Sequence, residues 1–80
     1  MSDPKFIHTG TPSTRAIEEC SELIQAICKA ERFGWHNTHP TTGETNFDAV
    51  RREMDDVVES IERLQEHMRA VNHAYNSRSS

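Results

Sequence analysis

Apolar residues recur at helical spacing in two stretches of the chain. In the first, Ile17, Cys20, Ile24 and Cys28 lie three or four residues apart, so they share one side of a helix centred near Cys20. In the second, the same period runs from residue 50 to residue 75. Two amphipathic helices and no alternating strand pattern predict an all-α fold.

Residue preferences set the ends of the first helix. Thr11 can cap its N-terminus, and Pro12 suits the first turn, where the missing N–H costs no hydrogen bond. Gly34 is typical of the residue that ends a helix. We therefore expect a helix over about 12–32, preceded by an irregular arm over 1–11.

The segment 34–46 is expected to be a loop, because it contains two glycines, one proline and four threonines. Asn46 is a candidate N-cap for a second helix over about 47–75, after which the apolar pattern fades. Residues 76–80 are expected to form a disordered tail. Helix, loop and helix together predict one domain over 12–75, folded as an antiparallel hairpin.

The chain is short for an independent fold. It has 80 residues, of which 34% are hydrophobic, and such a small apolar content gives a marginal core. A lone hairpin also leaves one side of each apolar stripe in water. We expect two or more hairpins to associate into a four-helix bundle, as a homodimer or homotetramer.

Charge and cysteine content narrow the class of protein. Nine basic against 13 acidic residues give a net charge of −4, which argues against a binder of duplex nucleic acid. No apolar run is long enough to cross a membrane, and no signal-peptide pattern begins the chain. Cys20 and Cys28 would lie about 12 Å apart on one helix, too far for a disulfide. These features favour a cytoplasmic protein, in the host cytoplasm if the protein is viral.

Two pairs of acidic residues carry the candidate chemistry. Glu19 and Glu22 form a Glu-x-x-Glu pair in the first predicted helix, and Glu53 and Asp56 form a Glu-x-x-Asp pair in the second. Residues three apart on a helix are neighbours, and an antiparallel hairpin can turn both pairs toward one space. Four carboxylates there would bind a hard cation, Mg²⁺ or alternatively Mn²⁺. Periodicity alone favours the simpler interpretation that these acids are solvated surface charges.

Other residues could contact a ligand near this site. Lys29 and Arg32 could hold phosphate oxygens, or they could simply be cations at the end of a helix. Trp35 could stack on a base or cover the end of the bundle. Asn46 could hydrogen-bond a base or sugar, although an N-cap is its simpler role.

At these acidic pairs the sequence resembles the all-α nucleoside triphosphate pyrophosphohydrolases, the MazG-like superfamily. Residues 18–26 (EECSELIQA) are similar to the family's first motif helix, and 52–57 (REMDDV) to its second. Residues 29–34 (KAERFG) resemble the continuation found in short phage-type members. The resemblance covers about 14–68, with a slightly longer interval between the acidic pairs and none of the extra helices of larger members.

The resemblance implies Mg²⁺-dependent hydrolysis of a nucleoside triphosphate, often a deoxynucleotide, to the monophosphate and pyrophosphate. It implies metal binding by Glu19, Glu22, Glu53 and Asp56. Glu22 or Glu53 would be the catalytic residue that accepts the proton of the attacking water. A non-catalytic helical oligomerisation module and a phosphoribosyl-ATP pyrophosphohydrolase are the alternatives.

Overall fold

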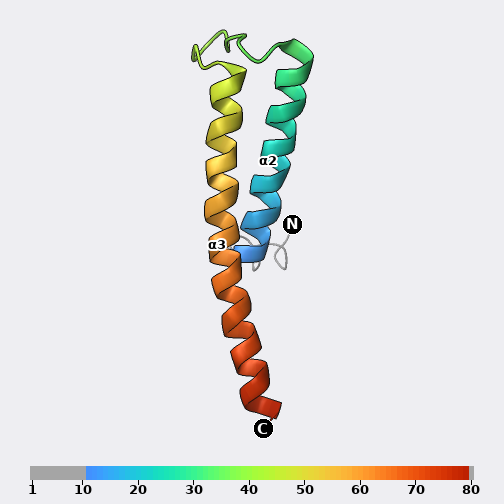
Figure 1. Ribbon diagram of the computed structural model, residues 1–80, viewed down its shortest axis with the longest axis vertical. Coiled ribbons are helices and arrows are strands. Elements are labelled where there is room, and N and C mark those ends of the chain that lie inside the picture. The colour runs from blue at the N-terminus through green and yellow to red at the C-terminus, as the bar shows by residue number, and fades with distance from the viewer. Residues whose placement is uncertain (1–10, 80) are drawn as a thin grey trace, which may run out of the picture.

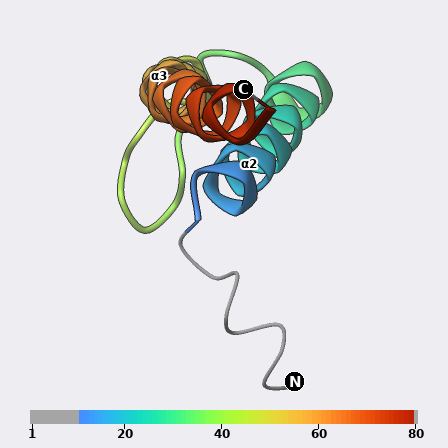
Figure 2. The ribbon, with the colours of Figure 1, turned by 90° about the horizontal axis from the view of Figure 1, so that it is seen from below.

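The computed structural model describes residues 11–79 and shows a helical hairpin. Helix α2 (Pro12–Phe33) and helix α3 (Asn46–Ser79) lie side by side and antiparallel, joined by the loop 34–45 (Figure 1, and from below in Figure 2). Within 11–79 the only β-type pairing is a single bridge across the loop. The all-α hairpin predicted from the sequence is confirmed. The predicted arm, Thr11 excepted, lies outside the described residues.

The ends of α2 follow the predicted capping chemistry. Thr11 caps the helix, because its Oγ1 accepts a hydrogen bond from the Thr14 N–H at 3.2 Å. Gly34 follows the last residue of the helix with a φ of 105°, in the range that favours glycine, and its N–H donates to the Ala30 carbonyl at 2.9 Å.

The start of α3 differs from the prediction. The capping residue is Thr45 rather than Asn46, since the Thr45 Oγ1 accepts from the Asp48 N–H at 3.1 Å. The Asn46 side chain instead donates to the Gly34 carbonyl at 2.7 Å. Asn46 is therefore used to tie the start of α3 to the end of α2, where a carbonyl has no partner within its own helix.

The far end of α3 also differs from the prediction. The segment 76–79, expected to be disordered, continues the helix to Ser79, and Ser80 lies outside the described residues. No glycine or proline follows Tyr75, and Arg78 in the last turn suits the helix dipole. The apolar pattern missed this segment because residues 76–79 (NSRS) include no hydrophobic side chain that could mark a helical period. No helix in the described part of the chain is long and apolar enough to span a membrane.

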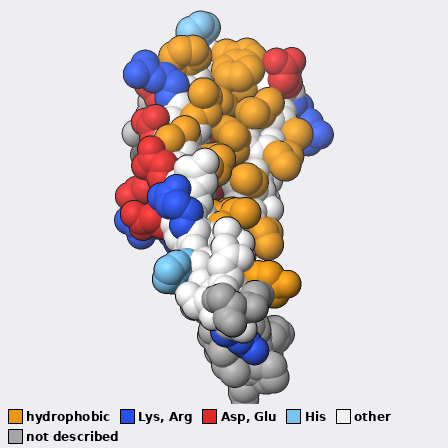
Figure 3. Space-filling model, turned by 60° about the horizontal axis from the view of Figure 1, so that its bottom comes forward, with side chains coloured by type: hydrophobic (Ala, Val, Ile, Leu, Met, Phe, Trp, Pro, Cys, Tyr) orange, Lys and Arg blue, Asp and Glu red, His pale blue; other side chains and the backbone are white. Residues whose placement is uncertain are grey.

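The interface between the helices is narrow and made of small residues. The buried hydrophobic residues are Ala16, Ala30, Val50 and Val57. The apolar stripe predicted around Cys20 does not face α3: Cys20 is exposed, and Ile17 and Ile24 are 67% and 61% exposed. The alanines allow the two helices to approach closely, so α2 turns its small residues inward. Its large residues contribute to an exposed apolar band along both helices (Figure 3).

Removal of the Thr45 cap tests the corrected start of α3. Thr45→Ala should lower the free energy of unfolding by about 1 kcal/mol, because the Asp48 N–H loses its partner. Thr45→Ser keeps the hydroxyl and should remain close to wild type. Urea titrations followed by circular dichroism measure both variants. Equal stability of Thr45→Ala and wild type would contradict the assignment of the cap.

Candidate functional site

Three glutamates from the two helices converge midway along the hairpin. Glu19 and Glu22 lie one turn apart on α2, and Glu53 faces them from α3. One carboxylate oxygen from each of the three lies within 4.8 Å of the others. Glu19 and Glu53 are only 8% and 9% exposed, whereas Glu22 is exposed. We call these three residues the acidic cluster.

Each buried glutamate has a hydrogen-bond partner on only one of its two carboxylate oxygens. Glu19 Oε2 accepts a hydrogen bond from Arg15 at 3.2 Å, and Glu53 Oε2 accepts one from Arg52 at 3.0 Å. The Oε1 atom of each is buried and has no hydrogen-bond partner. A buried carboxylate oxygen without a partner is costly, because it has lost water and gained nothing in return. Two such atoms beside a third carboxylate could serve as ligands for a cation.

The charges of Glu19 and Glu53 affect the pKa of Glu22. The negative charge of Glu19 raises the pKa of Glu22 above its ordinary value of 4.5, with partial desolvation and the charge of Glu53 adding to the effect. Each carboxylate therefore opposes the ionisation of its neighbour. A divalent cation among the three would remove this repulsion.

A second ionic network joins the loop to the acidic cluster. Arg52 donates to both oxygens of Glu44, from Nε at 3.1 Å and from Nη2 at 3.2 Å, while its Nη1 holds Glu53. The hydrogen bond from Arg52 lowers the pKa of Glu44. The arginine thus fixes one buried ligand and the loop at the same time. Oriented ligands of this kind are what metal sites require of the residues around them.

The fourth predicted ligand lies beside this arrangement. Asp56 is half-buried and lines a cavity of about 290 Å³ with Glu19, Arg15 and Ser60. Its carboxylate is not among the three whose oxygens lie within 4.8 Å of one another. The structure therefore brings Glu19, Glu22 and Glu53 together. Asp56 lies outside this cluster, in the cavity that it shares with Glu19. A ligand role for Asp56 stays a prediction.

The predicted substrate-binding residues lie toward the loop end. Lys29 and Arg32 are exposed in the last two turns of α2. The charge of Lys29 contributes to the lowered pKa of Glu44, so Lys29 lies within electrostatic reach of the loop. Trp35 is half-buried and donates to Glu31 at 3.1 Å. Its ring meets the ring of Phe47 edge-on at 6.5 Å, so Trp35, like Asn46, helps to fix the loop.

Sequence reasoning missed the residues that hold the acidic cluster in place. Arg15 precedes Glu19 by four residues, a spacing typical of helical ion pairs, and could have been found. Arg52 is adjacent to Glu53 in the sequence, which indicates their pairing less clearly. The sequence does not indicate a role for Glu44, because its pairing with Arg52 depends on the path of the loop.

The donor set is suited to a hard cation. All three members of the acidic cluster offer carboxylate oxygens, which Mg²⁺ and Mn²⁺ prefer, and none offers the imidazole or thiolate typical of zinc sites. The two unpartnered Oε1 atoms fit such an ion. In comparisons with known proteins, the chain matches no protein-family model, no curated protein and no solved structure.

Mg²⁺ should stabilise the wild-type protein against heat. A ligand at about one hundred times its dissociation constant adds about 2.7 kcal/mol to the free energy of unfolding. Glu53→Gln should abolish the rise in melting temperature between EDTA and saturating MgCl₂, because one charged ligand is lost. Glu62→Gln removes the same charge from an exposed position of α3 and should keep the rise. An equal rise in all three proteins would contradict a site at the acidic cluster.

The raised pKa of Glu22 predicts a pH dependence in metal-free protein. Folding raises this pKa, so the protonated form is favoured in the folded state. The stabilisation is complete below pH 4.5 and is lost as the pH rises through the raised pKa. The stability of wild type relative to Glu22→Gln should therefore fall over that range in EDTA. Chemical unfolding at a series of pH values measures it, and a constant difference would contradict the coupling.

Proposed function

We propose that the protein is a metal-dependent nucleoside triphosphate pyrophosphohydrolase of the MazG-like kind, releasing pyrophosphate and leaving the monophosphate. The observation that carries this proposal is the pair of buried, unpartnered oxygens on Glu19 and Glu53, directed into one cluster with Glu22. A divalent cation, when bound, supplies neutralising charge for a polyphosphate and lowers the pKa of water.

The three glutamates are suited to different tasks. Glu19 and Glu53 are buried and held by arginines, so they are the fixed ligands. Glu22 is exposed and can reach solvent, and the charge of Glu19 raises its pKa above the ordinary value of 4.5. A general base works best when its pKa lies near the working pH. We assign to Glu22 the acceptance of the proton from the attacking water.

Cationic side chains between the acidic cluster and the loop would receive the phosphates. Lys29 and Arg32 are exposed in the last two turns of α2, and a guanidinium such as that of Arg32 can bind a phosphate through two hydrogen bonds. Trp35 lies at the loop entrance, where an aromatic face could stack on the base. Together these residues would orient the triphosphate from the base at the loop toward the acidic cluster.

The exposed apolar band supports assembly as a four-helix bundle, as a homodimer or homotetramer. Only four hydrophobic residues are buried in the described hairpin, while Ile17, Ile24 and Val58 are each more than half exposed. Association of two hairpins through this band would bury these side chains. The same band would suit a non-catalytic interaction module, the second candidate function. Such a module has no need of buried carboxylate oxygens without partners, which favours the enzyme.

Pyrophosphate release tests the reaction directly. The purified protein with MgCl₂ and each common nucleoside and deoxynucleoside triphosphate should yield pyrophosphate and the monophosphate from at least one of them. Glu22→Gln should lower kcat by about 100-fold or more, because the proton acceptor is lost. Glu53→Gln should also lower the apparent affinity for Mg²⁺, and Glu62→Gln should behave as wild type.

Release of single phosphates would contradict the proposed reaction. The absence of any product from every nucleotide would favour the interaction module. Full activity in Glu22→Gln would reject Glu22 as the base without rejecting the reaction itself.

A further inference from the structure

Nearly half of α3 extends past the end of its partner helix. Leu64 borders the same groove as Ser13 and Ile17 in the first turns of α2, and α3 runs on for more than a dozen residues beyond that level (Figure 1). Every residue from 65 to 78 is exposed. We call 65–79 the α3 extension. Helix α2 cannot cover this segment, because it begins where the extension does.

A regular apolar row nevertheless continues along the whole of α3. Met54, Ile61, Met68 and Tyr75 follow one another at intervals of seven residues and are 42–67% exposed. Val57, Leu64 and Val71 alternate with them at intervals of three and four residues. This 3-4 spacing is the repeat by which one helix packs along another. The row is about 31 Å long, and its last three members, Met68, Val71 and Tyr75, lie on the α3 extension.

The side chains that flank the row on the extension include no Asp, Glu, Lys or Arg. They are Gln65 and Asn72 on one side, and His67 and Ala74 on the other. The charged residues of this segment, such as Glu66 and Arg69, lie at other positions of the repeat. Flanking charges decide which helices can pair, and like charges repel when identical helices meet. A flank without these four residue types spares two copies of the helix the repulsion of like charges facing one another.

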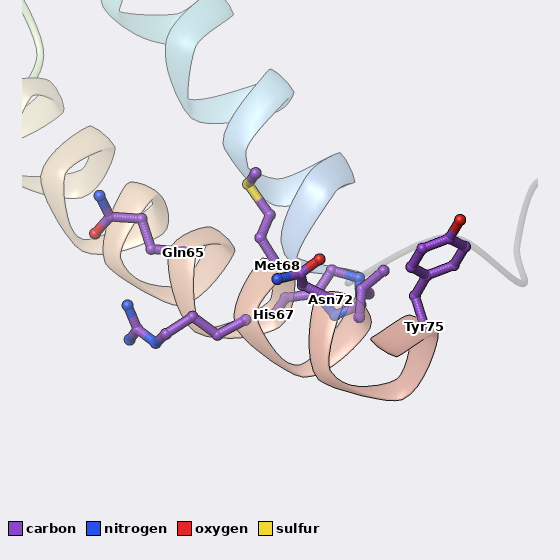
Figure 4. A pocket seen from close by; sticks show the side chains of 7 residues that line it. Gln65, His67, Met68, Asn72 and Tyr75 are labelled. Carbon is purple, nitrogen blue, oxygen red and sulfur yellow. The ribbon is translucent and has the colours of Figure 1, made fainter. Parts of the chain in front are cut away.

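The surface of the extension is hollowed along this row. A shallow groove of about 800 Å³ is lined by Met68, Val71 and Tyr75, with Gln65 and Asn72 among the polar residues at its sides (Figure 4). In the same view Met68 extends toward the side on which α2 begins. Arg69 adds a positive charge to the lining, but the walls are mainly apolar and suit the apolar face of another helix.

From these observations we infer that the α3 extension docks against α3 of a second copy of this chain. An α3 of 34 residues is long enough to cover the row from Met54 to Tyr75, whereas an α2 of 22 residues has little length to spare. The inference rests on the self-association proposed above and specifies its surface, and it does not depend on the hydrolytic activity. Assembly then requires residues remote from the acidic cluster.

Two matched double variants of the full chain test this surface. Met68→Glu with Val71→Glu places two carboxylates in the row, where pairing would bury them without partners. Ala70→Glu with His73→Glu adds the same two carboxylates to the other side of the extension. Sedimentation equilibrium without nucleotide or metal gives the mass of each. Wild type should be a multimer, the first variant should dissociate at concentrations about 100-fold higher or more, and the second should match wild type.

Three results would overturn the inference. The first is a wild-type monomer at all concentrations, which would leave the row to another protein or to the chain's own first residues. The second is an unchanged multimer in Met68→Glu with Val71→Glu, which would move the interface elsewhere and leave self-association intact. The third is equal dissociation of both variants. If circular dichroism shows that the glutamates unwind the helix, glutamine at the same two pairs of positions gives the same comparison. Pyrophosphate release is measured separately, so failure of the reaction is not confused with failure of the docking surface.

Discussion

The structure depends on an unfavourable contact between its two helices. Glu19 and Glu53 are buried against one another's helix, each with one oxygen on an arginine and one oxygen without a partner. A carboxylate in such a position is tolerated only when something balances its charge. The arginines balance part of it from the outside of the acidic cluster. The remaining charge is directed inward, where Glu22 adds a third carboxylate, and a divalent cation is the simplest species that completes the balance.

The same contact explains why few hydrophobic residues are buried between the two helices. Two glutamates use positions that leucine or isoleucine would fill in an ordinary helical pair, and alanines beside them let the helices come close. Little apolar area is buried as a result, and the large hydrophobic side chains lie on the outer face. A hairpin with so small a core would gain stability from the proposed ion and from the proposed second copy. Ligand binding and assembly are therefore both expected to control whether the fold persists.

Much of the fold could be predicted from local chemistry. Thr11, Pro12 and Gly34 set the limits of α2 because capping depends on residues next to one another in the chain. The acidic pair of α2 could be found because residues three apart on a helix must be neighbours. The side of α2 that faces α3 could not be predicted, since the preference for alanines over isoleucines at the interface arises from how closely the helices pack. The choice of Thr45 over Asn46 as a cap likewise depends on the Gly34 carbonyl across the loop.

The ligand set shows the same division between local and long-range information. Glu19, Glu22 and Glu53 meet as their spacing suggested, but the distance of Asp56 from them depends on the rotation of α3 about its axis. The role of Glu44 could not be predicted from the sequence, because the position of a loop residue depends on the whole path of the chain between the helices. The network from Glu44 through Arg52 to Glu53 joins the loop to the acidic cluster, so a ligand bound at one could affect the other.

Anomalous diffraction from crystals grown with Mn²⁺ tests the central claim most directly, since it locates the ion without reference to activity. We expect a peak bounded by the carboxylates of Glu19, Glu22 and Glu53, with the formerly unpartnered Oε1 atoms among its ligands. A map with no peak at the acidic cluster, and with those oxygens hydrogen-bonded to protein side chains instead, would contradict it.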